Sequence, residues 1–424
     1  MTRPRLTGGC DCGTIAGMRR RDLFALAGAA GMPVPAAQTL LPAPDLANLH
    51  PLMEFIAGQN APRLSFLDSR WRSLESWKRE ARPLFRRHLH YEPPAAPPAG
   101  EVIGRQEREG FILETVRIRA TAAYDIPARL LIPTARRGPV PGVLALHCHS
   151  GRYVWGHEKI ISRPGEPAVL TQFRNRAYGQ PYAELLARRG WVVLVIDAFY
   201  FGERRLRVEQ MDAHTAPGEF REALGKLAGL EPESPEWLAA IDSLAGRFEH
   251  LTAKTIFAAG ATWPGLLVWD DMRSLDYLAG RPEVDPRRIG CLGLSLGGLR
   301  TAYLIAADPR IKAACVTGWM TLFAEQLRNH LRSHTWMIYI PGLYAWLDLP
   351  DAAALVAPGA LLVQQCCRDA LYPLSGMKGA AEKLRKIYAK AGIPERFRAS
   401  FYDVPHSFTP QMQQEAFQWL EGWL

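Results

Sequence analysis

Short apolar runs alternate with segments of helical periodicity over most of the chain. The runs in residues 101–424 have the length and composition of buried strands, and the periodic segments between them often stop at a glycine, as helices do. The apolar runs predict strands at 111–120, 126–133, 142–149, 191–198, 288–294, 311–318, 359–366 and 396–404. The periodic segments predict helices at 182–190, 267–284, 297–307, 378–392 and 410–424.

The order of these elements indicates an α/β protein. Strands that are apolar along their whole length need cover on both faces, which is typical of a mostly parallel central sheet with helices on both sides. The first two predicted strands look instead like an antiparallel pair. Two long insertions, at residues 201–264 and 319–358, interrupt the alternation. Because such long connections are uncommon inside a compact domain, we expect them to form lids over a site.

The segment ahead of this domain, residues 41–100, predicts a helical extension followed by a linker. Apolar residues recur at helical spacing within 63–92, between arginines and a lysine, at Leu67, Trp71, Leu74, Ala81 and Phe85. A proline-rich stretch at 93–100 is typical of a stiff linker. The predicted basic amphipathic helix has two interpretations, a membrane-surface helix or a helix that packs on the domain, and we favour the second.

Residues 1–40 predict an export signal. Arg20 and Arg21 precede a short run of apolar and small residues that reaches Met32, which resembles a twin-arginine signal. Small residues at 35–37 offer a cleavage site, and Met18 is an alternative start. We therefore expect a periplasmic or secreted protein. The alternative is a disordered basic tail on a cytoplasmic enzyme.

The composition is that of an ordinary globular protein, with 48% hydrophobic and 22% charged residues. No apolar run reaches the roughly 18 residues of a membrane span. The net charge of +9 is not gathered into a Lys/Arg run with interleaved aromatics, so no nucleic-acid partner is expected. Seven cysteines without a C-x-x-C pair are not typical of a disulfide scaffold. We interpret Cys148, Cys291 and Cys315 as small core residues, and Cys366-Cys367 as an adjacent pair after a strand.

The sequence Gly293-Leu-Ser295-Leu-Gly297 joins a predicted strand directly to a predicted helix. The G-x-S-x-G pattern is frequent by chance, but this context is the one in which it builds a nucleophile. A serine on such a sharp turn projects its hydroxyl above the sheet, and glycines two residues to either side relieve the crowding. Ser295 is therefore the candidate nucleophile. The alternative is a structural glycine-rich turn.

A serine hydroxyl needs a base to take its proton, and the base needs a group that orients it. His406 lies between the last predicted strand and the last helix, where this arrangement places its histidine. Asp369 follows the strand that lies between the serine and the histidine in the sequence. The competing aspartates are less well placed, because Asp348 and Asp351 precede that strand and Asp403 lies on the last one.

The oxyanion of a tetrahedral intermediate needs backbone N–H donors. The N–H of Leu296, at the start of the helix, is one candidate, and the main-chain N–H of His149, in the loop after an earlier strand, is the second. His147 and His149 form a His-x-His pair that can ligate zinc, and His330 and His334 lie four residues apart. We interpret neither pair as a metal site, and we expect no metal and no cofactor.

Several segments of residues 100–424 carry a family resemblance: "ALHCHSGRYVWGHEKI", "DAFYFGERR", "VWDDMRSLDYLAGRPEVDPRRIGCLGLSLGG", "APGALLVQQCCRDALYP" and "VPHSF". They resemble the α/β-hydrolases of the dienelactone-hydrolase and acetyl-xylan-esterase-like group. The resemblance implies an α/β-hydrolase fold and a catalytic triad of Ser295, Asp369 and His406. Cys148 and Ser150 stand where the group has glycines, and Cys366-Cys367 stands where Gly-x is usual before the acid.

The expected function is that of a serine esterase, with a carboxylic ester of a small molecule or carbohydrate, preferably a short-acyl ester, as substrate. A peptidase or a carbon–carbon bond hydrolase with the same triad is the alternative, and a non-catalytic binding protein of the same fold is a third. Aromatic residues in and near the insertions are expected either to line a pocket or to form lid core: Trp155, Trp263, Trp319, Trp336, Tyr339 and Trp346.

Overall fold

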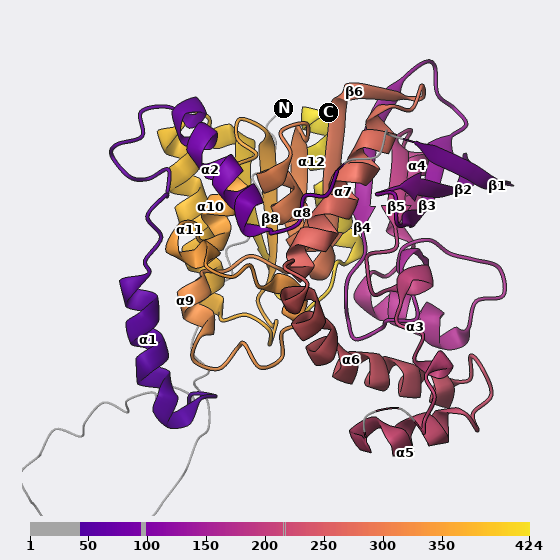
Figure 1. Cartoon of the computed structure of the whole chain (residues 1–424). Helices are drawn as coiled ribbons and strands as arrows, with labels where there is room; N and C mark the ends of the chain where they lie inside the picture. Colours follow the sequence, from indigo (N-terminus) through magenta and orange to yellow (C-terminus); the bar gives the residue numbers. More distant parts are fainter. Residues whose placement is uncertain (1–42, 95–98, 215, 217) are drawn as a thin grey trace, which may run out of the picture.

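A nine-stranded sheet forms the centre of the protein (Figure 1). The computed structural model describes residues 43–94, 99–214, 216 and 218–424. The predicted export signal at residues 1–40 lies outside them. The strands are β1 (Gly100–Arg108), β2 (Phe111–Arg119), β3 (Asp125–Pro133), β4 (Val140–Leu146), β5 (Val192–Ile196), β6 (Val284–Leu294), β7 (Ala313–Thr317), β8 (Ala360–Cys366) and β9 (Phe397–Tyr402).

The sheet is antiparallel at one edge and parallel elsewhere. Its strand order is β1-β2-β3-β5-β4-β6-β7-β8-β9. The β1–β2, β2–β3 and β3–β5 pairs are antiparallel, and every pair from β5–β4 to β8–β9 is parallel. The prediction of a mostly parallel sheet that begins with an antiparallel pair is therefore confirmed. In the parallel part the strand ends that precede the helices lie along one edge, which is where such sheets place their sites.

Helices cover both faces of the sheet, as predicted. They are α1 (His50–Gln59), α2 (Leu74–His88), α3 (Ala168–Ala177), α4 (Tyr182–Arg188), α5 (Gly218–Leu227), α6 (Pro235–Ala258), α7 (Trp263–Ala279), α8 (Leu296–Ala307), α9 (Phe323–Gln326), α10 (Leu349–Ala354), α11 (Leu374–Lys390) and α12 (Pro410–Trp423). In β4, Leu144 and Leu146 pack in the core with α2, α7 and α8, whereas Val143 and Ala145 pack in the core with α3, α4 and α12. Figure 1 shows α7 and α8 in front of the sheet and α12 behind it.

The prediction for residues 63–92 is wrong in one respect. The helix α2 begins only at Leu74, because the Ser73 side chain accepts a hydrogen bond from the Ser76 N–H and caps it there. The residues before it form turns, from which Trp71 still reaches the core. The apolar face of α2 packs on the domain, and the Phe85 ring lies 5.7 Å from that of Tyr303 on α8. The described contacts thus agree with the packing interpretation.

Other differences concern elements whose pattern is weak. The edge strand β1 has mostly exposed side chains and no apolar alternation, so its backbone pairing with β2 leaves little trace in the sequence. The insertion at residues 201–264 contains α5 and α6, and the insertion at 319–358 contains α9 and α10. The predicted helix at 267–284 is displaced, because Thr262 caps α7 at Trp263 and Val284 already belongs to β6.

No helix in the described ranges is both long enough and apolar enough to cross a membrane.

A fully buried ion pair links α8 to α7. Arg300 Nη2 lies 2.5 Å from Asp271 Oδ1, and the two side chains are 1% and 0% exposed. Burial raises the pKa of Asp271, and the neighbouring Arg300 guanidinium opposes this effect. Because α8 follows Ser295 directly, this pair fixes the helix at whose start the candidate nucleophile lies.

Replacement of Asp271 by alanine is expected to lower the free energy of unfolding by about 3–5 kcal/mol, because it leaves the Arg300 charge buried without a partner. Urea denaturation measures the change. The control is Glu382→Ala, which removes an exposed ion pair with Arg385 on α11 and is expected to change stability much less. Equal losses in the two variants would contradict this account of the pair.

Candidate active site

Ser295 lies at the turn between β6 and α8 in a strained conformation. Its φ is 60° and its ψ is −117°, and its N–H donates to Thr317 O at 2.9 Å. Two glycines make the turn possible. A Cβ on Gly293 would lie 2.5 Å from Leu146 O, and a Cβ on Gly297 would lie 2.1 Å from the same oxygen. The turn therefore packs directly on the end of β4, and larger residues at either glycine would push it away.

The two predicted partners of the serine lie together. Asp369 follows β8, and its Oδ2 accepts a 2.5 Å hydrogen bond from His406 Nδ1. Asp369 Oδ1 accepts a second bond from the Leu371 N–H at 2.9 Å. His406 Nε2 is enclosed and has no hydrogen-bond partner among the described residues. The His406 side chain borders the same cavity as Ser295. An imidazole oriented in this way presents Nε2 as a proton acceptor.

The competing aspartates have other partners. Asp348 and Asp351 form a capping box at the start of α10, and Asp351 also accepts a bond from Lys383. Asp403 pairs with Arg368 at the surface. Of the four aspartates weighed from the sequence, Asp369 is thus the one that contacts His406.

The two predicted oxyanion donors also border the cavity. The N–H groups of Leu296 and His149 donate to no other described residue, whereas the neighbouring Cys148 N–H already donates to the Tyr178 hydroxyl. The loop that carries His149 is tightly bent, since Ser150 has a φ of 54°. Cys148 and Ser150, the two departures from the family pattern, contact each other through Oγ and Sγ at 3.0 Å.

A buried lysine holds this loop from behind. Lys159 is 0% exposed, and its Nζ donates to Cys148 O at 2.8 Å and to His149 O at 3.1 Å. It also lies over the Phe201 ring. Burial lowers the pKa of Lys159 to about 8. The Cys148 carbonyl that Lys159 binds and the His149 N–H belong to one peptide group and point in opposite directions. The His149 N–H therefore points away from Lys159 and remains available.

A buried carboxylate joins the loop to both insertions. Glu249, on α6, accepts bonds from His149 Nε2 at 2.7 Å and from the Tyr153 hydroxyl at 2.8 Å. Its second oxygen accepts a bond from the Thr335 hydroxyl at 2.9 Å. Burial would raise the pKa of Glu249, but these donors outweigh it and the pKa is lowered. Neither Glu249 nor Lys159 was identified from the sequence, because a single buried Glu or Lys within an insertion or loop has no local pattern.

The cavity above Ser295 has a volume of about 310 Å³. Part of its lining comes from Ser295, His406 and the loop at 149–151. Another part of the lining comes from the insertion at 319–358, through Trp319, Ser333, His334, Thr335 and Ile338. Trp319 is the one residue of the predicted aromatic set that borders it. Trp155 and Trp263 are instead buried in the core, which agrees with the alternative interpretation.

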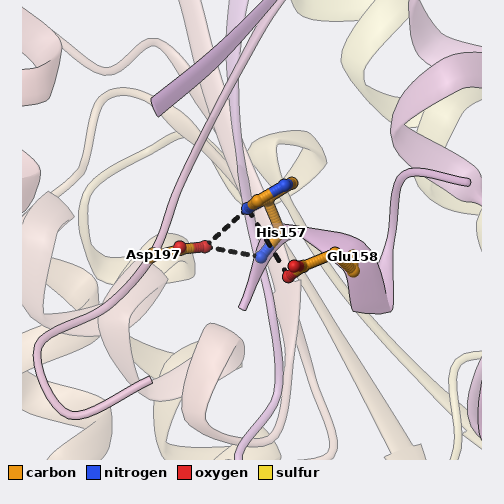
Figure 2. Close-up of side chains that lie close together, drawn as sticks. All are labelled: His157, Glu158 and Asp197. Carbon is orange, nitrogen blue, oxygen red and sulfur yellow. Dashed lines mark hydrogen bonds and ion pairs between the residues drawn. The ribbon is translucent and has the colours of Figure 1, made fainter. Parts of the chain in front are cut away.

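One group of side chains has the composition of a metal site. Figure 2 shows His157, Glu158 and Asp197, whose ligand atoms all lie within 4.8 Å of one another. Their atoms are engaged with each other and with the backbone. Asp197 Oδ1 accepts bonds from the ring and the N–H of His157, and Asp197 Oδ2 accepts the Glu203 N–H. Burial opposes the charges, but the contacts lower the pKa of Asp197 and raise that of His157.

These bonds hold the segment at 156–158 against the segment at 197–203. A Cβ on Gly156 or on Gly202 would lie 2.1 or 2.4 Å from an Asp197 oxygen, so both glycines are needed for the backbone to surround the carboxylate. The His-x-His pair is engaged in the same way. His147 bonds Cys148 O and the Ala198 N–H, and both ring nitrogens of His149 have partners.

Lys159 gives the stability of the protein a defined pH dependence. The folded protein releases the Lys159 proton near pH 8, whereas the unfolded chain holds it until about pH 10.5. Between these values the unfolded chain binds more protons, so stability rises with pH through this group. We expect wild type to gain stability relative to Lys159→Met between pH 8 and pH 10.5 in urea denaturation. The control Lys386→Met, at an exposed position on α11, is expected to run parallel to wild type. If the stability of Lys159→Met changes with pH in the same way as that of wild type, the lowered pKa of Lys159 is refuted.

Comparisons with known proteins address the fold. No family model matches the chain. It is 27% identical over 339 residues to "Putative hydrolase YtaP" of Bacillus subtilis (strain 168), which covers 78% of this chain and 95% of that protein. A structure described as a "putative acetyl xylan esterase" from Bacteroides fragilis NCTC 9343 matches with a TM-score of 0.61 and 18% identity, over 83% of this chain and 81% of that one.

A glucuronoyl esterase from Solibacter usitatus matches with a TM-score of 0.57 and 16% identity, over 85% of this chain and 97% of that one. Both solved structures are α/β-hydrolase-fold enzymes. The mostly parallel nine-stranded sheet with helices on both faces agrees with these matches. The chain therefore has the α/β-hydrolase fold.

Proposed function

We propose that this protein is a serine hydrolase that cleaves carboxylic esters, with short-acyl esters of carbohydrates or small molecules as substrates. The observation that carries the proposal is one cavity bordered by Ser295 and by His406, whose ring is held by Asp369, with two unoccupied backbone N–H groups at the same cavity. The names of the similar proteins, a hydrolase and two carbohydrate esterases, support the same class of reaction.

In the first half of the reaction His406 Nε2 takes the proton of the Ser295 hydroxyl while the serine oxygen attacks the ester carbonyl. Asp369 holds the imidazole in the required tautomer and stabilises its positive charge. The N–H groups of Leu296 and His149 bind the negative charge that develops on the carbonyl oxygen. His406 then gives its proton to the departing alcohol, and an acyl-enzyme remains on Ser295.

In the second half water attacks the acyl-enzyme and His406 accepts a proton from that water. The tetrahedral intermediate uses the same two N–H groups. Its collapse releases the carboxylic acid and returns the proton to Ser295. Besides the ester and water, these steps use only groups of the chain.

The proposed mechanism makes a direct prediction for Ser295. Wild type is expected to cleave 4-nitrophenyl acetate and acetylated xylose faster than longer acyl esters, and to leave a peptide amide intact. Ser295→Ala is expected to lower kcat for the esters by at least about 1,000-fold, because the acyl-enzyme cannot form. Ser243→Ala, at an exposed position of α6, is the control and is expected to keep its activity. An unchanged kcat in Ser295→Ala would sink the mechanism, and faster cleavage of the amide would favour a peptidase.

The second prediction concerns Glu249. Loss of its bonds to His149, Tyr153 and Thr335 is expected to displace the oxyanion loop and to lower kcat by up to about 100-fold in Glu249→Ala, with a smaller change in KM. Glu249→Gln keeps an acceptor for His149 and is expected to recover part of the loss. The matched control is Glu236→Ala, an exposed position on the same helix. A change confined to KM would argue against a role in positioning the loop.

A further inference from the structure

His334 is a cavity residue that the proposed mechanism does not use. It lies in the insertion at 319–358 and borders the same cavity as Ser295 and His406. Its Nε2 is 3.0 Å from Leu371 O, two residues beyond Asp369 in the sequence. Its ring packs on that of Tyr372, with 4.8 Å between the ring centroids. The side chain is therefore held in one orientation by the loop that carries the catalytic acid.

The bond to Leu371 determines which ring nitrogen carries the proton. A carbonyl oxygen only accepts, so Nε2 must be the N–H donor, and in a neutral imidazole Nδ1 is then an acceptor. Burial lowers the pKa of His334 to about 4, so the ring is neutral near pH 7. Nδ1 bonds no other described residue and is not among the enclosed polar atoms that lack a partner, which leaves it accessible.

The rest of the cavity has the chemistry of an uncharged polar ligand. Among the described side chains that border it, none is Lys, Arg, Asp or Glu. Trp319 and Ile338 supply apolar surface. Ser333 adds a hydroxyl group next to His334. A fixed acceptor in such surroundings matches a substrate group that donates one hydrogen bond and carries no charge, and on an ester of a sugar or small alcohol that group is a free hydroxyl.

We propose that His334 is a specificity-determining residue whose Nδ1 accepts a hydrogen bond from a free hydroxyl of the substrate, so that the site selects uncharged, hydroxyl-bearing esters such as partly acylated sugars. This inference rests on the proposed esterase function. A site built to bond a hydroxyl rejects the analogue without it, because the bound substrate then covers Nδ1 and leaves it unpaired.

The test compares matched substrates. Methyl xylopyranoside monoacetates and their counterparts that lack the hydroxyl next to the acetate are assayed with wild type, His334→Phe, His334→Gln and the control His214→Phe, an exposed position outside the cavity. In wild type we expect kcat/KM to be about tenfold higher for the hydroxyl-bearing ester, the worth of one such bond. In His334→Phe this ratio is expected to fall close to one.

Two further arms keep the outcome interpretable. His334→Gln retains a donor for Leu371 O and an acceptor for the substrate, so it is expected to keep most of the ratio, as is His214→Phe. Melting temperatures report whether each variant is folded. The substrate ratio of wild type tests the inference without any variant. A wild-type ratio near one, or a folded His334→Phe that keeps the wild-type ratio, overturns the inference and leaves the esterase proposal standing. A wild type that cleaves no ester overturns the proposed function instead.

Discussion

The contact between the β6–α8 turn and the end of β4 is the constraint on which the candidate site depends. Gly293 and Gly297 let the turn approach Leu146 O so closely that no side chain fits between them. This contact holds Ser295 at a φ of 60°, with Leu296 as the first residue of α8. It also fixes the distance from the serine to the loop that follows β4, because Leu146 is the last residue of that strand and His147 to His149 come next. The two predicted oxyanion donors thus lie on the two segments that meet at this contact. Leu296 follows the turn, and His149 lies in the loop after β4.

Much of the fold could be predicted from the sequence, because buried parallel strands consist of continuous apolar runs that are easily recognised. The segments that became β4 and β8 illustrate this, and the positions of Asp369 and His406 follow from the strands that precede them. The sequence is less informative where structure depends on distant partners. The strand β1 is exposed and is held by backbone bonds to β2, so its side chains carry no period. The Trp71 side chain is buried although the residue lies in the non-helical segment before α2, where its spacing predicted a helix.

The same reasoning explains which site residues the sequence missed. Ser295, Asp369 and His406 belong to a pattern of residue types at defined places between strands and helices. Glu249 and Lys159 act on the loop at 147–149 only because folding brings α6 and the segment after Trp155 against it. His334 was noticed only as one of a pair with His330. The bond from its ring to Leu371 O, which gives it a defined tautomer, appears only once the insertion is placed over the cavity.

Hydrogen bonds connect the two insertions to the loops that carry the candidate catalytic residues. Glu249 joins His149 on the oxyanion loop to Thr335 in the insertion at 319–358, and His334 in the same insertion contacts the loop of Asp369. The surroundings of Ser295 are therefore set by bonds that cross between the central sheet and its additions. If the proposed function holds, substrate specificity and oxyanion geometry both depend on the insertion at 319–358, through His334 and Thr335.

The central claim is that Ser295 is an activated nucleophile, and covalent labelling tests it most directly. The protein is incubated with a fluorophosphonate, which reacts with serines that a neighbouring base activates, and the labelled peptide is identified by mass spectrometry. The account predicts one adduct per chain, on Ser295, and much slower labelling in His406→Ala. An unlabelled protein, or an adduct on another residue with Ser295 unmodified, would contradict it.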